Sequence, residues 1–497
     1  MQVISEQQLS RLDSLAAAIE NGDGAPRFRL LRDGLAQAIE EGDLRGGDML
    51  PASRGLAEQL GVSRNTVSRA YRELAAEGYV QAMERVGYMV NGGLKKVGPG
   101  GRASSASPVR WEERLVDLPD EEHQPTRPAD WRSYPYPFVV GPGPESFPIA
   151  SWTRAMRTAL RKEHRGTSLH NLDDQDDPLL VEQIQHNLLP LRGIQAGQDE
   201  ILVTLGTQHG LHLVAEALLR SGGTVGVEDP GYPDARRIFL KKGARLRALP
   251  VDEQGVTVSG DLSGLDMIFV TPGRQFPTNV TMTIGRRRRL LSRAGREGTL
   301  VVEDDYDSEY CYGRHPPPAL KSLDRTGLVV YVGSFSKFLA PGLRLGFVVA
   351  DPVLIGHLRR LRHHMLRHPP GMIQRTTALM MEAGDYGRAI RRHRRVLSAK
   401  WQAINGAIED TFPWKVPVTD GGMSLWIGGP SDLDAGRLAE RALRRGVVIE
   451  PGGFCFIGPN RPARFFQLGF AAIDLEAIRP GVEKLARLLP SAVGMGR

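Results

Sequence analysis

The sequence predicts a multidomain protein in which an N-terminal winged helix-turn-helix (α+β) precedes an α/β domain with a large, mostly parallel sheet and a smaller α+β C-terminal lobe. Three observations support this fold class. The 497 residues exceed what one hydrophobic core usually serves. Residues 28–91 follow the order helix, helix, turn, helix, hairpin. From residue 138 onward, apolar strand-like runs alternate with amphipathic helical stretches.

Composition excludes several classes of protein. No apolar run approaches the roughly 18 residues that a membrane span requires. Two cysteines, Cys311 and Cys455, exclude a disulfide framework and a four-ligand zinc site, and no metal is expected. The start, MQVISEQQLS, does not resemble a secretory signal. A cytoplasmic protein is therefore predicted.

The charge balance gives only a weak indication of a partner. The formal net charge of +7 and the pI near 9.4 suggest an anionic ligand. However, residues 1–95 hold 11 Lys and Arg residues against 13 Asp and Glu residues. DNA binding by this segment would therefore depend on where its arginines lie.

The N-terminal domain is expected at residues 28–91, after an extension covering residues 1–27. Helices are predicted over 28–42, where apolar residues recur on one face, and over 53–60. After a turn, Ser63 is a good N-cap for a third helix that ends at Gly78. YVQAMERVGYMV then predicts a hairpin with a turn near Gly87.

In a helix-turn-helix, the first residues of the second helix of the pair contact base edges in the major groove. Arg can bond guanine through two atoms and Asn can bond adenine in the same way. An isolated Arg on a helix is usually only solvated, but the ordered set here favours binding to double-stranded DNA. The expected contacts are Ser63, Arg64, Asn65, Thr66 and Arg69 on the recognition helix, Arg54 on phosphate, and Gly87 and Tyr88 on the wing.

Residues 92–137 are rich in Gly, Ser and Pro at their start and are predicted to form a linker. The second domain is expected over 138–490, with the smaller lobe starting at about residue 351. Its strands are predicted at ILVTLG, TVGVED, LDMIFVTP, GTLVVEDDY, GLVVYVGS and LGFVVA.

The stretch VYVGSFSKFLAPGLRLGFV carries the most informative chemistry. A predicted buried strand ends at Gly333, and Lys337 follows in a loop with Ser334 and Ser336 before it and Arg344 after it. Hydroxyls and a planar guanidinium suit a phosphate dianion, and a lysine held beside them suits covalent attachment of an aldehyde cofactor.

Three other segments extend this set. The strand in TLVVEDDYDSEY delivers acidic side chains and Tyr306 at its carboxyl end, where ligands bind in open α/β sheets; a metal site is the alternative. In EDPGY, Tyr232 could stack on a cofactor ring. In LGTQHG, the amides of Thr207 and Gln208 could hold phosphate at a helix start.

These motifs resemble known families. LPASRGLAEQLGVSRNTVSRAYRELAAEGYV is similar to the DNA-binding domain of the GntR family over residues 28–91, although Arg85–Val90 departs from the usual wing turn. The order GTQ, EDPGY, TPGRQFPT, EDDYDSE and SFSK-LAPGLRLG resembles fold-type I, class I aminotransferases over 138–490. Joined in one chain, the two modules resemble the MocR/GabR regulators.

The resemblance implies pyridoxal 5′-phosphate as cofactor. Lys337 would form the Schiff base, Asp304 would pair with the pyridine nitrogen and Tyr306 with the 3′ oxygen. It also implies a homodimer with active sites at the subunit interface. The phosphate would be held by Ser334, Ser336 and Arg344.

The segments expected to hold a substrate depart from the aminotransferase pattern. Gln467 stands where relatives carry the Arg that grips the α-carboxylate, and Arg464 points to the opposite face if the segment is a strand. Arg274 and Asn279 replace the usual His and Gly, and residues 170–174 lack the usual Tyr-Gly-Asp. Gln467 and Arg274 are the candidate effector-binding residues.

These departures predict a regulator that senses a small amine other than a simple α-amino carboxylate, such as a sulfonate amine, a diamine derivative or free pyridoxal phosphate. A working aminotransferase with an accessory DNA-binding domain is the alternative. A third interpretation, in which the N-terminal domain only assembles subunits, is disfavoured by the residues around Arg64.

Overall fold

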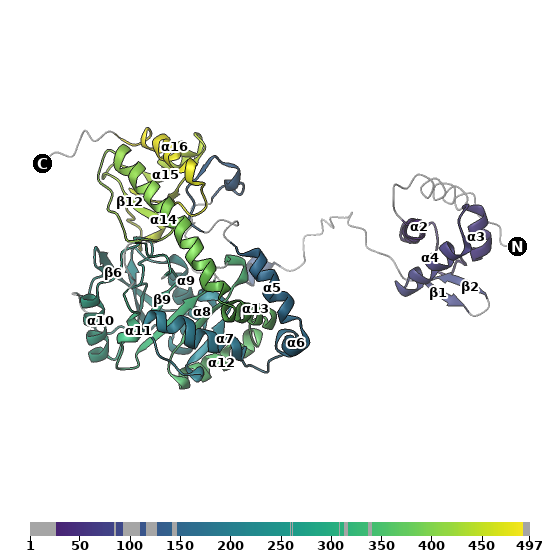
Figure 1. The fold of residues 1–497 in the computed structure, drawn as a ribbon, viewed down its shortest axis with the longest axis horizontal. Helices are drawn as coiled ribbons and strands as arrows, with labels where there is room; N and C mark the ends of the chain where they lie inside the picture. The colour runs from purple at the N-terminus through teal and green to yellow at the C-terminus, as the bar shows by residue number, and fades with distance from the viewer. Residues whose placement is uncertain are drawn as a thin grey trace. The chain divides into compact units, whose positions relative to one another are not determined.

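The computed structural model describes residues 26–83, 86–92, 110–115, 127–141, 147–258, 260, 262–307, 309–312, 317–335 and 340–490. The chain divides into two compact units, residues 1–115 and 116–497 (Figure 1). Ser336 and Lys337, two of the predicted cofactor residues, lie outside the described residues, as does the chain before Pro26. Within the described residues, no helix has the length and apolar character needed to cross a membrane.

The first unit is the predicted winged helix-turn-helix. Its elements are α2 (Arg27–Glu41), α3 (Ser53–Gln59), α4 (Arg64–Ala76), β1 (Val80–Met83) and β2 (Gly87–Val90). Leu31 and Leu35 of α2 meet Val67 and Leu74 of α4 in one buried core. The α4 helix begins where predicted, because the side chain of Ser63 accepts a hydrogen bond from the Thr66 amide.

The second unit is built on an eight-stranded sheet of order β4-β11-β10-β9-β8-β5-β6-β7. The β11 strand runs antiparallel to both neighbours and β7 antiparallel to β6, while the other pairs are parallel. The strands are β4 (Ile201–Thr204), β5 (Thr224–Asp229), β6 (Arg245–Asp252), β7 (Gly255–Val256), β8 (Met267–Val270), β9 (Leu300–Asp305), β10 (Val329–Ser334) and β11 (Gly346–Val349). The six predicted strands are all present; β6 gave no apolar signal because most of its residues are not buried.

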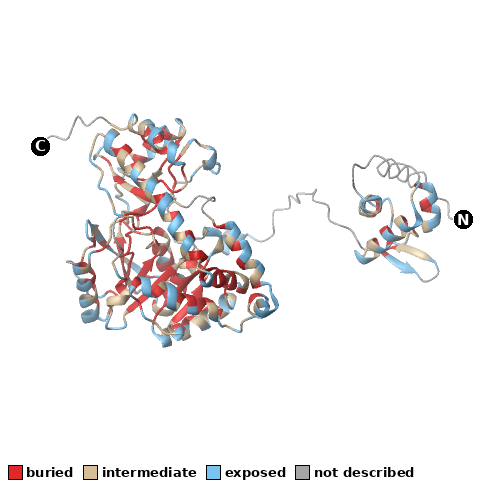
Figure 2. Cartoon of the chain, viewed as in Figure 1, coloured by how far each residue is buried: buried red, intermediate tan, exposed pale blue. Residues whose placement is uncertain are grey.

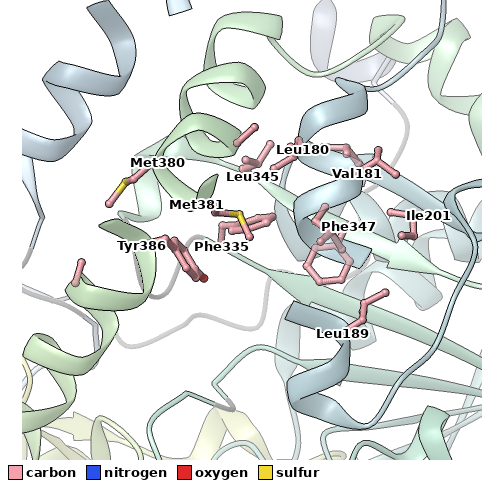
Figure 3. Packing of buried hydrophobic residues seen from close by; sticks show 14 of the residues in the cluster. Leu180, Val181, Leu189, Ile201, Phe335, Leu345, Phe347, Met380, Met381 and Tyr386 are labelled. Carbon is pink, nitrogen blue, oxygen red and sulfur yellow. The ribbon is translucent and has the colours of Figure 1, made fainter. Parts of the chain in front are cut away.

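Helices cover both faces of this sheet, and the strands are buried between them (Figure 2). Alternate residues of β4 face opposite sides of the sheet: Leu202 packs in one cluster, whereas Ile201 and Val203 pack in another. Figure 3 shows the second of these clusters, with Ile201 labelled. The helices are α5 (Ile149–Ala159), α6 (Lys162–Leu169), α7 (Pro178–Gln183), α8 (Gly206–Leu218), α9 (Pro233–Lys241), α10 (Ile284–Glu297), α11 (Leu320–Leu323), α12 (Pro352–Leu366) and α13 (Gly371–Glu382).

The smaller lobe has its own core. The boundary between this lobe and the large sheet differs from the predicted one. Ile355 and Leu358 of α12 pack with the large sheet, so the predicted lobe start near residue 351 is too early. Phe138, in contrast, lies in the core of the smaller lobe. The lobe contains β3 (Tyr136–Pro137), β12 (Ser424–Gly428), α15 (Ala435–Leu443), β13 (Val447–Val448), β14 (Glu450–Pro451), β15 (Phe465–Gly469) and α16 (Leu475–Ala486). Helix α14 (Asp385–Thr411) belongs to both cores, because Tyr386 and Leu397 pack with the large sheet and Ile404 packs in the lobe.

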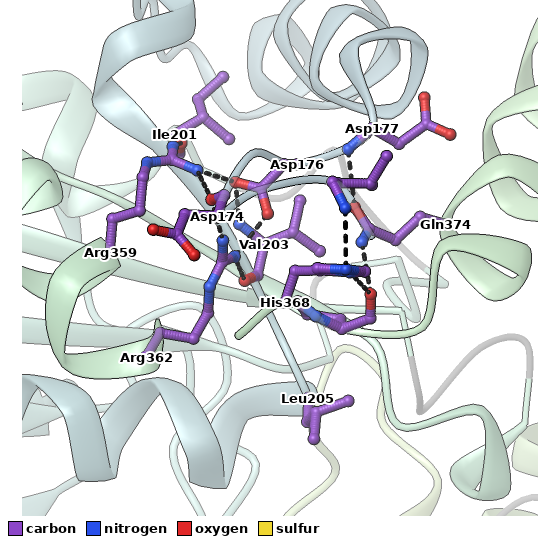
Figure 4. A network of polar contacts seen from close by, with 12 residues as sticks. Asp174, Asp176, Asp177, Ile201, Val203, Leu205, Arg359, Arg362, His368 and Gln374 are labelled. Carbon is purple, nitrogen blue, oxygen red and sulfur yellow. Dashed lines mark hydrogen bonds and ion pairs between the residues drawn. The ribbon is translucent and has the colours of Figure 1, made fainter. Parts of the chain in front are cut away.

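A polar network fixes the segment that replaces the usual Tyr-Gly-Asp (Figure 4). The carboxylate of Asp176 pairs with Arg359 and Arg362 of α12, and both guanidiniums also donate to the Asp174 carbonyl. Arg362 donates further to the Val203 carbonyl in β4. The network therefore anchors the strand whose carboxyl end leads into the turn at Thr207.

Candidate functional site

A cavity of about 400 Å³ lies in the second unit, at the carboxyl ends of β9 and β10 and the first turn of α8. Its position agrees with the rule that open α/β sheets bind ligands at this edge. The lining contains seven of the nine predicted cofactor residues: Thr207, Gln208, Tyr232, Asp304, Tyr306, Ser334 and Arg344. Lys337 follows Ser334 by three positions in the sequence.

One end of the cavity suits a phosphate group. Thr207 and Gln208 occupy the first turn of α8, where backbone amides point outward, and Ser334 adds a hydroxyl from the end of β10. Arg344 completes the set, with its Nη2 3.5 Å from Oε1 of Gln208. Arg344 has φ 47° and ψ 57°, an uncommon conformation for a residue other than glycine that is often found at ligand-binding positions.

At the other end, strand alternation separates the three consecutive acids of β9. Glu303 accepts hydrogen bonds from the Leu320 and Lys321 amides, and Asp305 pairs with Arg192 at 2.6 Å. These two side chains are thereby used in structure, whereas Asp304 lines the cavity. No group of three or more His, Cys, Asp or Glu side chains that could hold a metal ion occurs among the residues that the structure describes.

Aromatic side chains form the wall beside Asp304. The rings of Tyr232 and Phe276 meet edge to face with centroids 5.5 Å apart, and Tyr306 contacts Phe276 at 6.4 Å. Burial raises the pKa of both tyrosines well above the ordinary value, so each keeps its phenolic hydrogen. The site therefore offers a carboxylate, hydroxyl donors and a flat aromatic surface, which together match a protonated pyridine ring with a hydroxyl substituent.

The first unit presents a separate site at the start of α4. Arg64 and Asn65 are exposed there, and no side-chain partner of either occurs among the described residues; Arg54 is likewise exposed at the start of α3. Thr66 bonds the Ser63 hydroxyl at 2.8 Å. Ser63, Arg64, Asn65 and Thr66 therefore lie together at the start of α4.

The other predicted DNA contacts have partners within the domain. Arg69 pairs with Glu73 at 3.2 Å and its guanidinium lies 3.6 Å from the centre of the Phe28 ring. Tyr88 packs against Tyr71 with ring centroids 5.1 Å apart, and Gly87 has φ 134° at the hairpin turn. Arg64 and Asn65, in contrast, are exposed and have no side-chain partner among the described residues.

Comparison with known proteins matches both units to families. The gntR family of bacterial regulatory proteins matches residues 31–90, and the aminotransferase class I and II family matches residues 143–485. The HTH-type transcriptional regulator TauR of Rhodobacter capsulatus is 37% identical over 94% of this chain and 97% of its own length. The probable rhizopine catabolism regulatory protein MocR of Rhizobium meliloti is 32% identical over 93% of each chain.

The chain belongs to the MocR/GabR family of transcriptional regulators. Among solved structures, a kynurenine aminotransferase of Pyrococcus horikoshii, determined with PMP, is 26% identical with a TM-score of 0.69. The alignment covers 76% of this chain and 97% of that one. The predicted family and fold class are both confirmed.

In this MocR/GabR-type chain, the residues that depart from the aminotransferase pattern have structural partners. Arg274 is buried and donates to the Tyr310 carbonyl at 3.0 Å. Asn279 adopts φ 61°, a conformation open to Asn as well as to the Gly of relatives, and it donates to the Ser424 carbonyl. Gln467 is buried in β15, and the cavity lining includes neither Arg274 nor Gln467. Arg464 is exposed against the Phe465 ring.

Sequence reasoning missed a supporting carboxylate behind the cavity. Thr271, which lines the cavity, donates its hydroxyl to Glu228 at 2.6 Å, and Gln275 donates to the same oxygen at 3.2 Å. Burial raises the pKa of Glu228 to about 7. Its place directly before Asp-Pro-Gly-Tyr in the sequence was the available signal.

Sequence reasoning also missed a second part of the cavity lining. Residues 127–141, called the strap below, line the cavity with Arg127, Trp131 and Arg132. Arg127, Trp131 and Arg132 fell in the predicted linker (92–137), because that part of the segment has scattered prolines and no clear period. The available signal was the run of aromatic and basic residues in WRSYPY.

Proposed function

We propose that this chain is a pyridoxal-phosphate-dependent transcriptional regulator whose aminotransferase-like unit senses a small amine and thereby alters DNA binding. The single observation that carries the proposal is the cavity, whose hydrogen-bond donors at one end fit a phosphate and whose carboxylate at the other end fits a protonated pyridine. The same chain carries α4 as the proposed recognition helix, so ligand binding in the cavity could alter DNA binding.

The residues that would hold the cofactor form two groups, one for its ring and one for its phosphate. Asp304 would keep the pyridine nitrogen protonated, Tyr306 would bond the 3′ oxygen and Tyr232 would contact the ring face. Thr207, Gln208, Ser334, Ser336 and Arg344 would hold the phosphate. When bound through Lys337, pyridoxal phosphate supplies an electrophilic carbon that an effector amine can attack.

DNA binding is proposed at the start of α4, with Arg64 and Asn65 on base edges, Ser63 and Thr66 beside them, and Arg54 on phosphate. Since the aminotransferase-like unit is expected to form a homodimer, two recognition helices would be available per regulator. An effector that favours one arrangement of the two would change promoter affinity.

A gel-shift titration of the full chain on its own upstream DNA tests the DNA-binding proposal. Arg64→Ala is expected to weaken specific binding about 10-fold or more, as for loss of a base-contacting Arg. Arg72→Ala is the matched control, because Arg72 is exposed two turns further along the same helix. Equal binding by Arg64→Ala and wild type would refute the recognition-helix assignment.

Cofactor attachment has its own test. After incubation with pyridoxal phosphate, Lys337→Ala is expected to lack the visible absorption band of the wild type, while Lys415→Ala, which alters an exposed lysine outside the cavity lining, keeps it. A band retained by Lys337→Ala would show that another lysine carries the cofactor.

A working aminotransferase is the second candidate function, favoured by the seven predicted cofactor residues that line the cavity. The neutral Gln467 in place of an Arg argues against efficient turnover of α-amino acids. Steady-state transamination assays with amino donors and 2-oxo acids distinguish the two functions, since a sensor is expected to bind amines without sustained turnover.

A further inference from the structure

We infer that Arg132, supported by the indole of Trp131, binds an acidic group on the effector. The effector class is then a small molecule with an amine at one end and a carboxylate or sulfonate at the other. The inference rests on the proposed function, because it concerns the ligand of the same cavity. It assigns a role to the strap, which contains none of the residues proposed to hold the cofactor.

The cavity has two walls that the cofactor would use and one that it would not. The sheet edge and α8 supply the phosphate and ring contacts. The strap forms the remaining wall, with Arg127, Trp131 and Arg132 in the lining. A ligand that enters beside the cofactor would therefore meet guanidinium groups and an aromatic ring on this wall.

The two strap arginines are not equivalent. Arg127 is already neutralised, because its Nε lies 2.6 Å from Oε1 of Glu450 and its Nη2 donates to the Val140 carbonyl at 3.1 Å. Glu450 also accepts the Val140 amide at 2.8 Å, so this pair ties the strap to β14.

Arg132, in contrast, has no acidic partner among the described residues. Its guanidinium carbon lies 4.3 Å from the centre of the Trp131 ring, a stacking contact that orients the group and leaves its N–H donors available. An exposed, oriented guanidinium at the edge of a ligand cavity suits a carboxylate or sulfonate.

The environment of Gln467 explains why the acidic group would bind elsewhere than in relatives. Gln467 pairs with Glu450 across the β14–β15 ladder, so an anion at position 467 would lie beside an existing carboxylate. Arg464 lies against the Phe465 ring, 5.0 Å from its centre, and is absent from the cavity lining. Arg132 is therefore the favourable position for an anion.

The test uses full-length protein loaded with pyridoxal phosphate and three probes of similar size: 3-aminopropanoate, 2-aminoethanesulfonate and propylamine. Binding is measured by calorimetry and by the change in cofactor absorbance. The wild type is expected to bind at least one acidic probe more tightly than propylamine. The probe that binds more tightly identifies the carboxylate or the sulfonate as the preferred group.

Arg132→Gln is expected to weaken binding of that acidic probe about 10-fold, as for loss of one charge-assisted contact, and to leave propylamine binding unchanged. Arg132→Lys should recover part of the loss because it keeps the charge. Arg464→Gln, which removes an exposed arginine outside the cavity, is the matched control and should bind like wild type.

Unchanged binding of the acidic probe by Arg132→Gln, equal loss for acidic and neutral probes, or a wild type that binds propylamine as tightly as the acidic probes would each overturn the assignment to Arg132 while leaving amine sensing intact. Binding of none of the three amines by the cofactor-loaded wild type would overturn the proposed function as well.

Discussion

Two adjacent carboxylates of β9 are expected to respond in opposite ways to the same substitution. Asp305 and Arg192 have side chains 1% and 7% exposed, and they form a two-point pair with the 2.6 Å contact supplemented by one at 3.2 Å. Asp305 also accepts the Tyr331 hydroxyl at 2.7 Å. Asp305→Asn keeps the shape but leaves the Arg192 charge buried without a counterion, which typically costs about 3–5 kcal/mol of unfolding free energy.

Asp304→Asn changes the neighbouring residue, whose side chain faces the cavity. The expected loss of unfolding free energy is smaller than for Asp305→Asn, because the buried two-point pair between Asp305 and Arg192 is retained. Affinity for pyridoxal phosphate should fall, since the residue proposed to pair with the pyridine nitrogen loses its charge.

Urea unfolding of the full-length apo-protein and a pyridoxal-phosphate titration measure the two effects separately. A large stability loss in Asp304→Asn, or a wild-type stability in Asp305→Asn, would refute the division of β9 into a structural and a cofactor-facing side.

Three further outcomes follow from other contacts. Ser63→Ala removes the N-cap of α4 and should destabilise the winged helix-turn-helix by about 1 kcal/mol in thermal unfolding of the wild-type and variant chains; an unchanged transition would contradict the capping role. Asn279→Gly should be better tolerated than Asn279→Val, because φ 61° is strained for a β-branched residue; similar melting temperatures for the two would contradict this. Since Glu228 titrates near pH 7 when folded and near 4.5 when unfolded, the folded state holds the extra proton between these values and its stability falls as pH rises through this window. Glu228→Gln should reduce that slope in melting curves at about pH 5 and pH 7.5, and an identical slope would count against it.

Much of this architecture could be predicted from sequence, because local patterns determine it. The six apolar runs of the large sheet and the Ser63 cap are visible without tertiary information. Asp304 was chosen among the three acids by resemblance to aminotransferases, and in the structure the alternation along β9 turns Glu303 and Asp305 to the other face.

The remaining features depend on contacts between distant residues. The pairing of Arg127 with Glu450 joins positions 323 residues apart, so no local pattern could reveal that a proline-rich segment lines the cavity. Likewise, the sequence predicts Arg274 as an effector-binding residue. In the structure its guanidinium donates to the carbonyl of Tyr310, 36 positions away. Helices α12 and α13 were assigned to the wrong lobe, since amphipathic periodicity does not say which surface a helix covers.

The strap has a mechanical consequence for the whole chain. The strap residues that line the cavity are also the part of the lining nearest in sequence to the winged helix-turn-helix. Arg127 follows Gly92 by 35 positions. A ligand that draws Arg132 inward, or an anion that competes with Glu450 for Arg127, would displace the strap. Occupancy of the cavity would then act on the strap, the part of the lining nearest in sequence to the winged helix-turn-helix, with no rearrangement of the sheet required.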